Sequence, residues 1–525
     1  MKLALCVIKR ARAIFFISTL LLISLIFGPS WAQTTSLTIL HTNDTHSHLL
    51  PFSYPSMSDP CSPTAALPER KDIGGIARRA TLVKQIRGEL KAKGIPVWLV
   101  DAGDFSDGTF FSIEYRGEAD VAAMNAAGYD FATLGNHDFN YPLAQTQKLI
   151  SLASYPILCA NALLKATREP LARVYKVEQA GPVRVGIFGL VTVEARSYLA
   201  AREGVIIADA VRTARRIVAK LRTEKADIIV LISHCGEEED KRLAAMVPGI
   251  DVIVGGHSHS RLPSGEFVWR TEDLNLKTDR VNGTIIVQAH QWGGELGRCD
   301  LLFKKEPAGT WHVERYRARL IPITVAIEPD AQVAAVIDRY RNPINAHYAE
   351  VIGEAVDDFS SRCDDWAEYN LVADAVRETF GTEIEIENLG GVRSPLLKGT
   401  ITRGDLVALD PFANTVVTFK ITGLQLRKIL ARYAPAVSGV RYRLENGELV
   451  EVRVNGEPLQ DNRWYTGATN SYFADTALKR ARVKFQDTRK QRLEVLIKYI
   501  RQKGTIQPVY DGRRVVISGP SVERR

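Results

Sequence analysis

Five short motifs in this chain carry side chains that bind divalent metal ions, and each motif follows an apolar run. The motifs are Asp44-Thr45-His46, Gly103-Asp104, Gly135-Asn136-His137-Asp138, Ser233-His234 and Gly256-His257-Ser258-His259. Five of the ten histidines of the chain fall within them, which chance placement would rarely produce. Imidazole, carboxylate and amide oxygen together suit zinc, manganese, cobalt or iron, without selecting one of them. The pattern indicates a hydrolase site that holds two divalent metal ions.

The apolar runs that precede the motifs have the sequence of buried parallel strands, which are continuous rather than alternating in hydrophobicity. They cover residues 37–40, 97–100, 131–134, 228–232 and 252–254. In open α/β folds a site forms where the carboxyl ends of such strands open into loops. We therefore expect the five motifs to meet at one edge of the fold.

A pair of metal ions about 3.5–4 Å apart needs a carboxylate shared between them, with mixed nitrogen and oxygen ligands on each side. Asp104 is the predicted bridge, because it follows a strand directly and would lie centrally. The remaining predicted ligands divide into one set for each ion: Asp44, His46 and His259 for the first, and Asn136, His234 and His257 for the second.

His137 and Asp138 follow the predicted ligand Asn136 but point elsewhere on the same turn. We expect them to form a catalytic pair. His137 would donate to the leaving oxygen or to the phosphoryl group, and Asp138 would orient and charge the imidazole ring.

The first 32 residues have the pattern of a secretory signal peptide. A basic segment with Lys2, Lys9, Arg10 and Arg12 precedes an apolar stretch at 13–27, and Ser30-Trp31-Ala32 offers small residues for cleavage. An uncleaved membrane anchor is the second interpretation, because the stretch is shorter than the ~20 residues of a spanning helix. We predict a periplasmic or secreted protein without a stable membrane span.

Removal of those four basic residues lowers the formal net charge from +8 to +4. So small an excess, without a dense basic stripe, argues against a nucleic-acid partner. The odd number of cysteines that remain leaves at least one thiol unpaired within the chain, and their spacing indicates no zinc site: Cys61, Cys159, Cys235, Cys299 and Cys363.

A chain of 525 residues exceeds one compact core, so we expect two domains. Residues 36–323 alternate strand-like and helix-like segments, with helices predicted at 76–90, 118–127 and 208–221, which implies βαβ units and helices layered over a central sheet. The insertion at 51–68, rich in proline and serine, is predicted to be a surface loop near the site.

A continuous helical pattern that opens at Glu328-Pro329-Asp330 predicts an interdomain helix. Strands at 415–421 and 450–454, the latter followed by the turn signal Asn455-Gly456, belong to the second domain. The predicted division is a signal peptide at 1–32, a catalytic domain at 33–325, a linker helix at 326–350 and a substrate-binding domain at 351–525.

With these motifs in this order, the chain resembles the secreted 5′-nucleotidase family of two-domain, calcineurin-like metallophosphoesterases, which includes periplasmic UDP-sugar hydrolases. The resemblance implies a four-layer αββα metallophosphoesterase domain followed by a smaller α/β domain. It also implies that the seven predicted ligands bind two metals and that His137 and Asp138 are the catalytic pair.

In the second domain, the resemblance implies that the loop Asn388-Leu389-Gly390-Gly391-Val392-Arg393 holds the substrate. Asn388 and Arg393 are the expected contacts, since an arginine can make two parallel bonds to a phosphate. Arg362 lies where the family has a second arginine, although its surroundings differ. Phe412, in a family motif, is at least as readily explained by core packing as by substrate contact.

The chain departs from the family near its C-terminus, where Asn470-Ser471-Tyr472-Phe473 is not followed by the usual Gly-Gly-Asp and aromatic residue. Tyr433, Tyr472 or Phe473 could replace the missing base-stacking ring, but core packing is the better prediction for each singly.

The predicted activity is release of phosphate from nucleotides, with UDP-sugars or cyclic nucleotides as further substrates. The alternatives are a phosphatase of non-nucleotide phosphoesters, a thiosulfohydrolase-like enzyme, and a secreted binding protein without activity. The sequence does not predict the oligomeric state.

Overall fold

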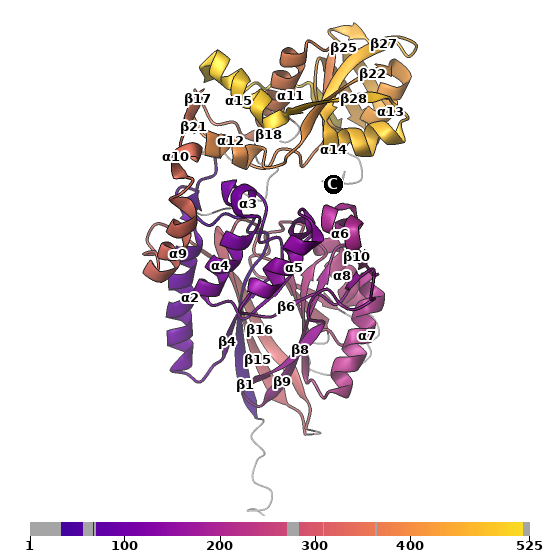
Figure 1. Cartoon of the computed structure of the whole chain (residues 1–525). Helices are drawn as coiled ribbons and strands as arrows, with labels where there is room; N and C mark the ends of the chain where they lie inside the picture. The colour runs from indigo at the N-terminus through magenta and orange to yellow at the C-terminus, as the bar shows by residue number, and fades with distance from the viewer. Residues whose placement is uncertain are drawn as a thin grey trace, which may run out of the picture.

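The computed structural model describes residues 33–55, 67, 70–269, 283–307, 309–362 and 365–517. These residues form two α/β parts, one above the other in Figure 1, with the N-terminal part below. The predicted signal peptide, most of the insertion at 51–68, and Cys61 and Cys363 lie outside the described residues. Within the described part of the chain, no helix is both long and apolar enough to cross a membrane.

The N-terminal part contains two six-stranded sheets. The first has the order β16-β15-β1-β4-β5-β6, with bounds Trp311–Pro322, Glu295–Lys305, Thr34–Thr42, Val97–Asp101, Phe131–Thr133 and Ile157–Leu158. The second has the order β13-β14-β12-β11-β9-β8, with bounds Glu266–Trp269, Gly283–Val287, Val252–Gly255, Ile228–His234, Val183–Val191 and Tyr175–Ala180. All five predicted strands are present, and neighbours among them pair in parallel, as in β1 with β4 and β11 with β12.

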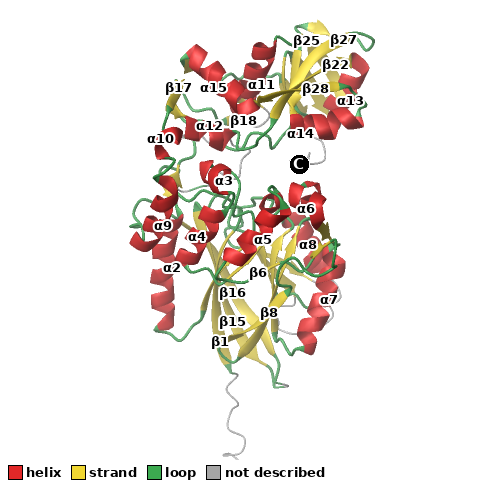
Figure 2. Cartoon of the chain, viewed as in Figure 1, coloured by secondary structure: helices red, strands yellow, loops and turns green. Residues whose placement is uncertain are grey.

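The two sheets pack face to face, and helices cover their outer faces (Figure 2). Side chains such as Leu37 and Val100 of the first sheet and Val185 and Val230 of the second form one buried cluster between them. Outside the first sheet lie α2 (Ile76–Lys91), α4 (Glu118–Ala127) and α5 (Leu143–Leu152), and outside the second lie α7 (Ala210–Thr223) and α8 (Glu237–Met246). The four-layer αββα prediction is confirmed, whereas a single central sheet is wrong, because alternation of elements does not reveal that strands divide between two sheets.

The three predicted helices of this part are confirmed as α2, α4 and α7. Helix α7 shows which features of the sequence allowed the prediction. Asp209 caps its first turn by accepting a hydrogen bond from the Arg212 amide. Its buried residues recur on one face of the helix, at Ala210, Ala214, Ile217 and Leu221.

The connection between the two parts is two helices rather than the one predicted. Asp330 accepts hydrogen bonds from the amides of Gln332 and Val333 and begins α9 (Ala331–Arg341), as the sequence predicted. The helix then ends before Pro343, and α10 (Asn345–Tyr348) follows. Proline has no amide hydrogen and its ring clashes with the preceding turn, so it interrupts a pattern that is otherwise helical.

The C-terminal part has two larger sheets of its own, beside smaller ones of three and two strands. The five-stranded sheet has the order β23-β20-β27-β22-β28, with bounds Ala436–Ser438, Ile384–Glu387, Trp464–Asn470, Thr415–Thr422 and Phe485–Gln491. The four-stranded sheet has the order β26-β25-β24-β30, with bounds Glu457–Pro458, Glu448–Val454, Val440–Glu445 and Arg514–Ile517. Both strands predicted for this part are therefore present, as β22 and β25.

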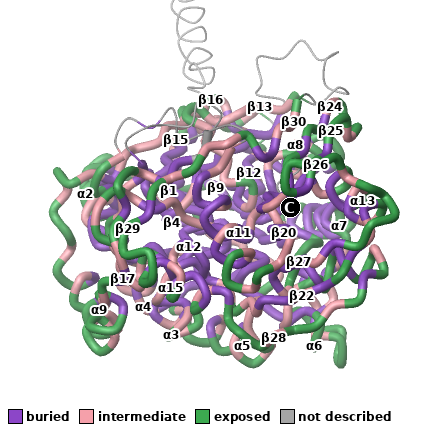
Figure 3. Tube along the Cα trace, turned by 90° about the horizontal axis from the view of Figure 1, so that it is seen from above, coloured by how far each residue is buried: buried purple, intermediate pink, exposed green. Residues whose placement is uncertain are grey.

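The predicted turn after β25 is also present. Asn455 and Gly456 both have positive φ, 49° and 88°, as a tight hairpin turn requires. The main helices of this part are α11 (Ala367–Phe380), α12 (Arg403–Leu409), α13 (Gly423–Tyr433) and α15 (Arg492–Lys503). Seen from above, buried segments run through the middle of the molecule (Figure 3).

Arg492, at the start of α15, is fully buried and holds this part together. Its guanidinium contacts Glu387 of β20 at 2.6 Å and Asp410 at 2.6 Å, and it donates to the carbonyl of Gly391 at 2.7 Å. Burial alone would lower the pKa of Arg492, but the charges of Asp410 and Glu387 raise it above its ordinary value.

We expect Arg492→Met to lower the free energy of unfolding by about 3–5 kcal/mol, because it leaves two carboxylates buried without their counter-charge. Denaturant unfolding of the purified protein measures this change. Arg427→Met, which removes the exposed pair with Asp461, is the control and should cost less than about 1 kcal/mol. Equal stability of the two variants would contradict the assigned role of Arg492.

Candidate metal centre

The loops that follow β1, β4, β5, β11 and β12 converge at one end of the two sheets. The Asp44 amide donates to the Gly103 carbonyl at 2.9 Å and the His46 amide to the Asp104 carbonyl at 3.0 Å. A carboxylate oxygen of Asp104 accepts from the His137 amide at 2.8 Å. The expectation that the five motifs meet at one edge is therefore confirmed, although that edge is shared by two sheets.

The backbone of these loops is strained where the predicted ligands lie. Asp44, His46, Asp104, His257 and His259 have φ values of 49°, 45°, 53°, 75° and 54°. Such regions cost residues other than glycine on the order of 1–3 kcal/mol each, and they persist mainly at functional sites. Gly103 leaves no room for a side chain, since a Cβ there would lie 2.7 Å from the Gly135 amide nitrogen and 2.9 Å from His234 Nδ1.

Buried acids outside the ligand set brace these loops. Asp138 accepts from the amides of Asp104 and Gly135, and Asp240 accepts from the Ser233 hydroxyl, directly before His234. Asp101 accepts from the Thr42 hydroxyl and the Gly103 amide, and burial raises its pKa to about 7. The hydrogen bonds of these interior polar groups are thus directed at the strand ends that carry the motifs.

The side chains form two groups that could each hold one cation. Potential ligand atoms of Asp44, His46 and His259 lie within 4.8 Å of one another, and so do those of Asp104, His234 and His257. Asn136 joins the second group, because its Oδ1 lies 3.2 Å from His234 Nε2. The structure thus brings together all seven side chains that the sequence singled out as ligands.

Asp104 lies between the two groups. Its Oδ2 is 3.1 Å from His234 Nε2 and 3.8 Å from His46 Nε2. Asp44 belongs to the first group, with Oδ1 at 3.2 Å from His259 Nε2. Both carboxylates are almost completely buried, so their charge must be balanced inside the protein.

Two of the rings are oriented by backbone carbonyls. His46 Nδ1 lies 2.7 Å from the Asp107 carbonyl, and His234 Nδ1 lies 2.7 Å from the Ala102 carbonyl. Since a carbonyl only accepts, each Nδ1 carries the proton and each Nε2 is directed toward the carboxylates. This is the arrangement by which outer hydrogen bonds fix metal-binding imidazoles.

The electrostatics of the cluster favour a cation. Burial alone would raise the pKa of Asp104, but the neighbouring His234 and His137 hold it well below its ordinary value. Burial would lower the pKa of His234, yet Asp104 and Asp44 raise it to about 10. The raised pKa of His234 reflects the uncompensated negative charge of the buried carboxylates, and divalent cations would supply that compensation. The donor set and its charge fit two such ions.

The predicted pairing of His137 with Asp138 is wrong. The Asp138 carboxylate accepts from the amides of Gly135, Asp104 and Ser106 and from the Ser106 hydroxyl. Consecutive residues on the short helical turn His137–Phe139 point in different directions, so Asp138 braces the loops while His137 faces away.

The carboxylate beside the His137 ring is Asp107, with Oδ2 at 2.9 Å from Nδ1. The sequence analysis missed Asp107, which lies only three residues after Asp104. Asp107 could have been predicted as a site residue, because it lies in the same loop as the predicted ligand Asp104.

The second part of the chain reaches the same centre. Arg393 Nη2 donates to His46 Nε2 at 3.1 Å. The loop that carries Arg393 is held by its neighbours: Asn470 donates to the Asn388 side chain at 2.7 Å, and the Gly390 amide donates to the Tyr369 hydroxyl at 2.7 Å. For Arg362 only the backbone, in β18 (Ser361–Arg362), is described.

The four aromatic residues that the sequence analysis considered for substrate contact differ in their surroundings. Phe473 is buried and Tyr433 packs against it, with ring centroids 5.5 Å apart, so core packing is confirmed for both. Tyr472 is 51% exposed, and core packing is wrong for it. Phe412 stacks toward His137, with centroids 6.2 Å apart and planes 28° apart, so it faces the metal centre rather than the core.

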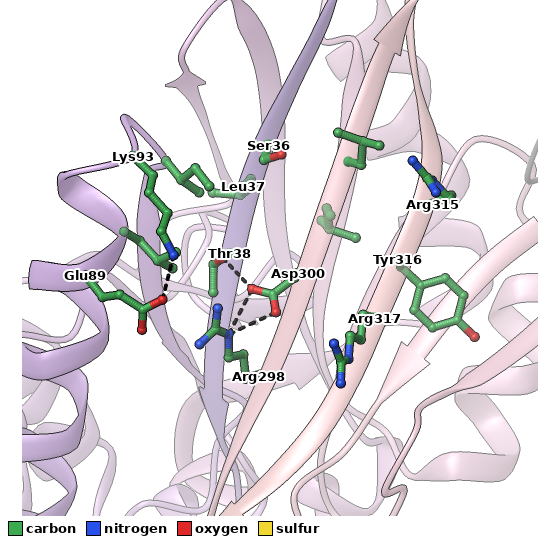
Figure 4. A pocket seen from close by; sticks show the side chains of 14 residues that line it. Ser36, Leu37, Thr38, Glu89, Lys93, Arg298, Asp300, Arg315, Tyr316 and Arg317 are labelled. Atoms are coloured by element: carbon green, nitrogen blue, oxygen red, sulfur yellow. Dashed lines mark hydrogen bonds and ion pairs between the residues drawn. The ribbon is translucent and has the colours of Figure 1, made fainter.

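A hollow of about 420 Å³ lies elsewhere, on the outer face of the first sheet (Figure 4). It is lined by Thr38, Lys93, Arg298, Arg315 and Arg317, among others, and Arg298 there bonds to Asp300. These residues lie beside the early part of β1, whereas the metal centre follows the carboxyl end of that strand. The hollow is therefore separate from the candidate site.

Comparison with known proteins agrees with this architecture. Residues 37–261 match the calcineurin-like phosphoesterase family, and residues 350–478 match the 5′-nucleotidase C-terminal domain. The chain is 30% identical over 516 residues to the protein UshA of Yersinia enterocolitica, covering 86% of this chain and 89% of that protein. It is 31% identical to the human 5′-nucleotidase, covering 80% of this chain and 75% of that protein.

Among solved structures, the 5′-nucleotidase precursor of Thermus thermophilus is similar, with a TM-score of 0.81, 28% identity, and coverage of 92% of this chain and 100% of that chain. The two domains and the convergent ligand groups define a metallophosphoesterase, a hydrolase of phosphoester bonds. The chain belongs to the 5′-nucleotidase family, as its resemblance in sequence indicated.

We expect Asp104→Ala to abolish hydrolysis and to reduce the bound metal below two ions per chain, because the Asp104 carboxylate lies 3.1 Å from His234 of one ligand group and 3.8 Å from His46 of the other. Metal analysis of the purified variant, beside an assay of phosphate release, tests this. Full activity with two ions still bound would contradict the assignment.

Proposed function

We propose that this protein is an exported 5′-nucleotidase. Two divalent metal ions would be held by Asp44, His46 and His259 and by Asn136, His234 and His257, with Asp104 as a ligand between the two sets. The proposal rests on one observation: side chains from both domains meet at the candidate metal centre. The first domain contributes a buried cluster of metal-binding side chains, and the second contributes Arg393 and Phe412 to the same cluster. The proposed division of the chain is that of the sequence: signal peptide 1–32, catalytic domain 33–325, linker 326–350 and substrate-binding domain 351–525.

The relatives support a nucleotide as the substrate, since two of the similar proteins are themselves 5′-nucleotidases. A nucleoside monophosphate has an anionic end and an aromatic end, and the site offers a partner for each. Arg393 would bind the phosphate or the ribose next to the metals. The partly buried ring of Phe412, beside His137, would stack on the base.

Two divalent cations bound at the cluster would lower the pKa of water and neutralise the phosphoryl oxygens. His137 would act on the substrate itself, because its Nδ1 is engaged by Asp107 and no described residue bonds to its Nε2. We assign it proton donation from Nε2 to the leaving ribose oxygen. Asp138 would act only by fixing the Gly103-Asp104 and Gly135-Asn136 loops.

A screen of phosphate release tests the function. The purified protein, supplied with Mn²⁺, Zn²⁺ or Co²⁺, is offered nucleoside mono-, di- and triphosphates, UDP-sugars, cyclic nucleotides and simple phosphomonoesters. We expect nucleoside monophosphates to be hydrolysed with the highest kcat/KM. Equal rates on simple esters, or no metal-dependent release from any nucleotide, would contradict the proposal.

We expect His137→Ala to lower kcat by about 10²–10⁴-fold, the usual contribution of a proton-transfer residue, while two metal ions remain bound. The matched control is His312→Ala, since His312 lies on β16 and pairs with Glu314 and Glu306. Loss of one metal ion together with activity would show that His137 is a ligand instead.

Arg393→Ala should raise KM for nucleoside monophosphates by about tenfold or more, the effect of losing a charge-assisted contact. The small ester p-nitrophenyl phosphate should be affected much less if Arg393 contacts the nucleoside side. Arg393→Lys, which keeps the charge but not the planar fork, should be intermediate. An equal loss on both substrates would place the Arg393 contact on the phosphate that they share, and an unchanged KM for both would contradict a binding role.

A further inference from the structure

One residue outside the predicted ligand set contacts two rings of the centre at once. Asp107 lies in the loop between β4 and α3 (Phe110–Tyr115), is 4% exposed, and has a φ of 73°. That left-handed conformation is uncommon outside glycine, although aspartate adopts it more readily than most residues, and here the hydrogen bonds of its carbonyl and carboxylate hold it. Its backbone and its side chain point to different imidazoles.

The carbonyl oxygen of Asp107 accepts from His46 Nδ1 at 2.7 Å. This bond leaves His46 Nε2 directed toward Asp104 and Asp44. The next residue, Gly108, allows the close approach, since a Cβ there would lie 2.7 Å from the His46 carbonyl oxygen. The backbone of the loop therefore orients a proposed metal ligand.

The carboxylate of Asp107 faces the other ring. Oδ2 lies 2.9 Å from His137 Nδ1 and accepts from Asn140 Nδ2 at 2.6 Å. Asn140 Nδ2 is itself 3.2 Å from His137 Nδ1. Asp138, the carboxylate adjacent in sequence, is occupied by three amides and a hydroxyl, so Asp107 takes the place in which Asp138 was expected.

We propose that Asp107 is the positioning residue of the centre: its carboxylate holds the His137 ring with Nε2 toward the substrate, while its carbonyl sets the ring of His46. The proposal rests on the proposed function of His137. A carboxylate on one ring nitrogen fixes both the tautomer and the orientation of an imidazole, and the other nitrogen is then presented to the reaction.

The two contacts can be separated by substitution. Asp107→Gly keeps the positive φ without strain and therefore keeps the carbonyl bond to His46, but it deletes the carboxylate. Asp107→Asn keeps the shape and removes the charge. Asp107→Asn combined with Asn140→Asp returns a carboxylate within reach of the same ring nitrogen from the other side. Asn140→Asp alone is the matched control for the second change.

We expect Asp107→Gly to lower kcat about 10–100-fold, the effect of losing an outer hydrogen bond to a functional imidazole, with KM nearly unchanged and two metal ions still bound. Asp107→Asn should also lose kcat, and the double variant should recover most of it. A purely structural role for Asp107 would give no recovery. Wild-type kcat in Asp107→Gly, or no gain in the double variant over Asp107→Asn, would overturn the proposal.

Ring orientation gives a readout that does not need activity. Crystal structures of the metal-loaded wild type and Asp107→Gly should show the His137 ring rotated in the variant and the His46 ring in place. An unmoved His137 ring would overturn the proposal. If the wild type itself releases no phosphate from nucleotides, the proposed function fails, and the ring comparison still decides whether Asp107 positions His137.

Discussion

The structure depends on the burial of two carboxylates, Asp44 and Asp104, among four imidazole rings. Acidic groups this deep in a protein are costly unless a counter-charge lies within a few ångströms. Here His234 lies 3.1 Å from Asp104 and His259 lies 3.2 Å from Asp44. The Nε2 atoms of His46 and His234 are turned inward by carbonyl bonds on the far side of each ring. The positive φ values of five ligand residues belong to the same arrangement, because the loops must turn sharply to aim every donor at one point. Backbone strain is accepted locally so that these donors converge.

The second domain is engaged with the first rather than separate from it. Besides the Arg393 contact, the linker itself packs on the first domain: Phe110 stacks on Tyr348 of α10 at 4.9 Å, and the Tyr348 hydroxyl donates to Glu114 at 2.6 Å. These contacts lie beside α9 and α10, where the chain passes between domains, whereas Arg393 and Phe412 reach the centre itself. Rotation of the second domain about α9 and α10 would leave the Tyr348 contacts near the pivot. It would withdraw Arg393 and Phe412 from the metal centre. Domain closure assembles a site from two domains in this way.

Strand position, domain order and the convergence of the candidate ligands could be predicted from the sequence, because each motif follows a continuous apolar run and each run is a strand with a buried face. The prediction failed where the direction of a side chain mattered. Asp138 and His137 are adjacent in sequence but diverge on a helical turn, and Asp107 meets His137 only through the fold, from 30 positions earlier in the chain. Pro343 broke a helix that hydrophobic periodicity alone extended. Local pattern specifies which elements form, and it contains no information about which of several nearby carboxylates will face a given ring.

A short motif such as Gly-Asn-His-Asp therefore identifies candidate ligands better than it identifies the residues that support them. The structure places Asn136 beside His234 and His137 beside Asp107, both on the turn that follows β5. The carboxylate that supports the histidine need only reach Nδ1, and positions 107 and 140 both lie within reach of that nitrogen. Which of these groups supports the ring is decided by the fold, so the supporting carboxylate must be identified from geometry rather than from the motif.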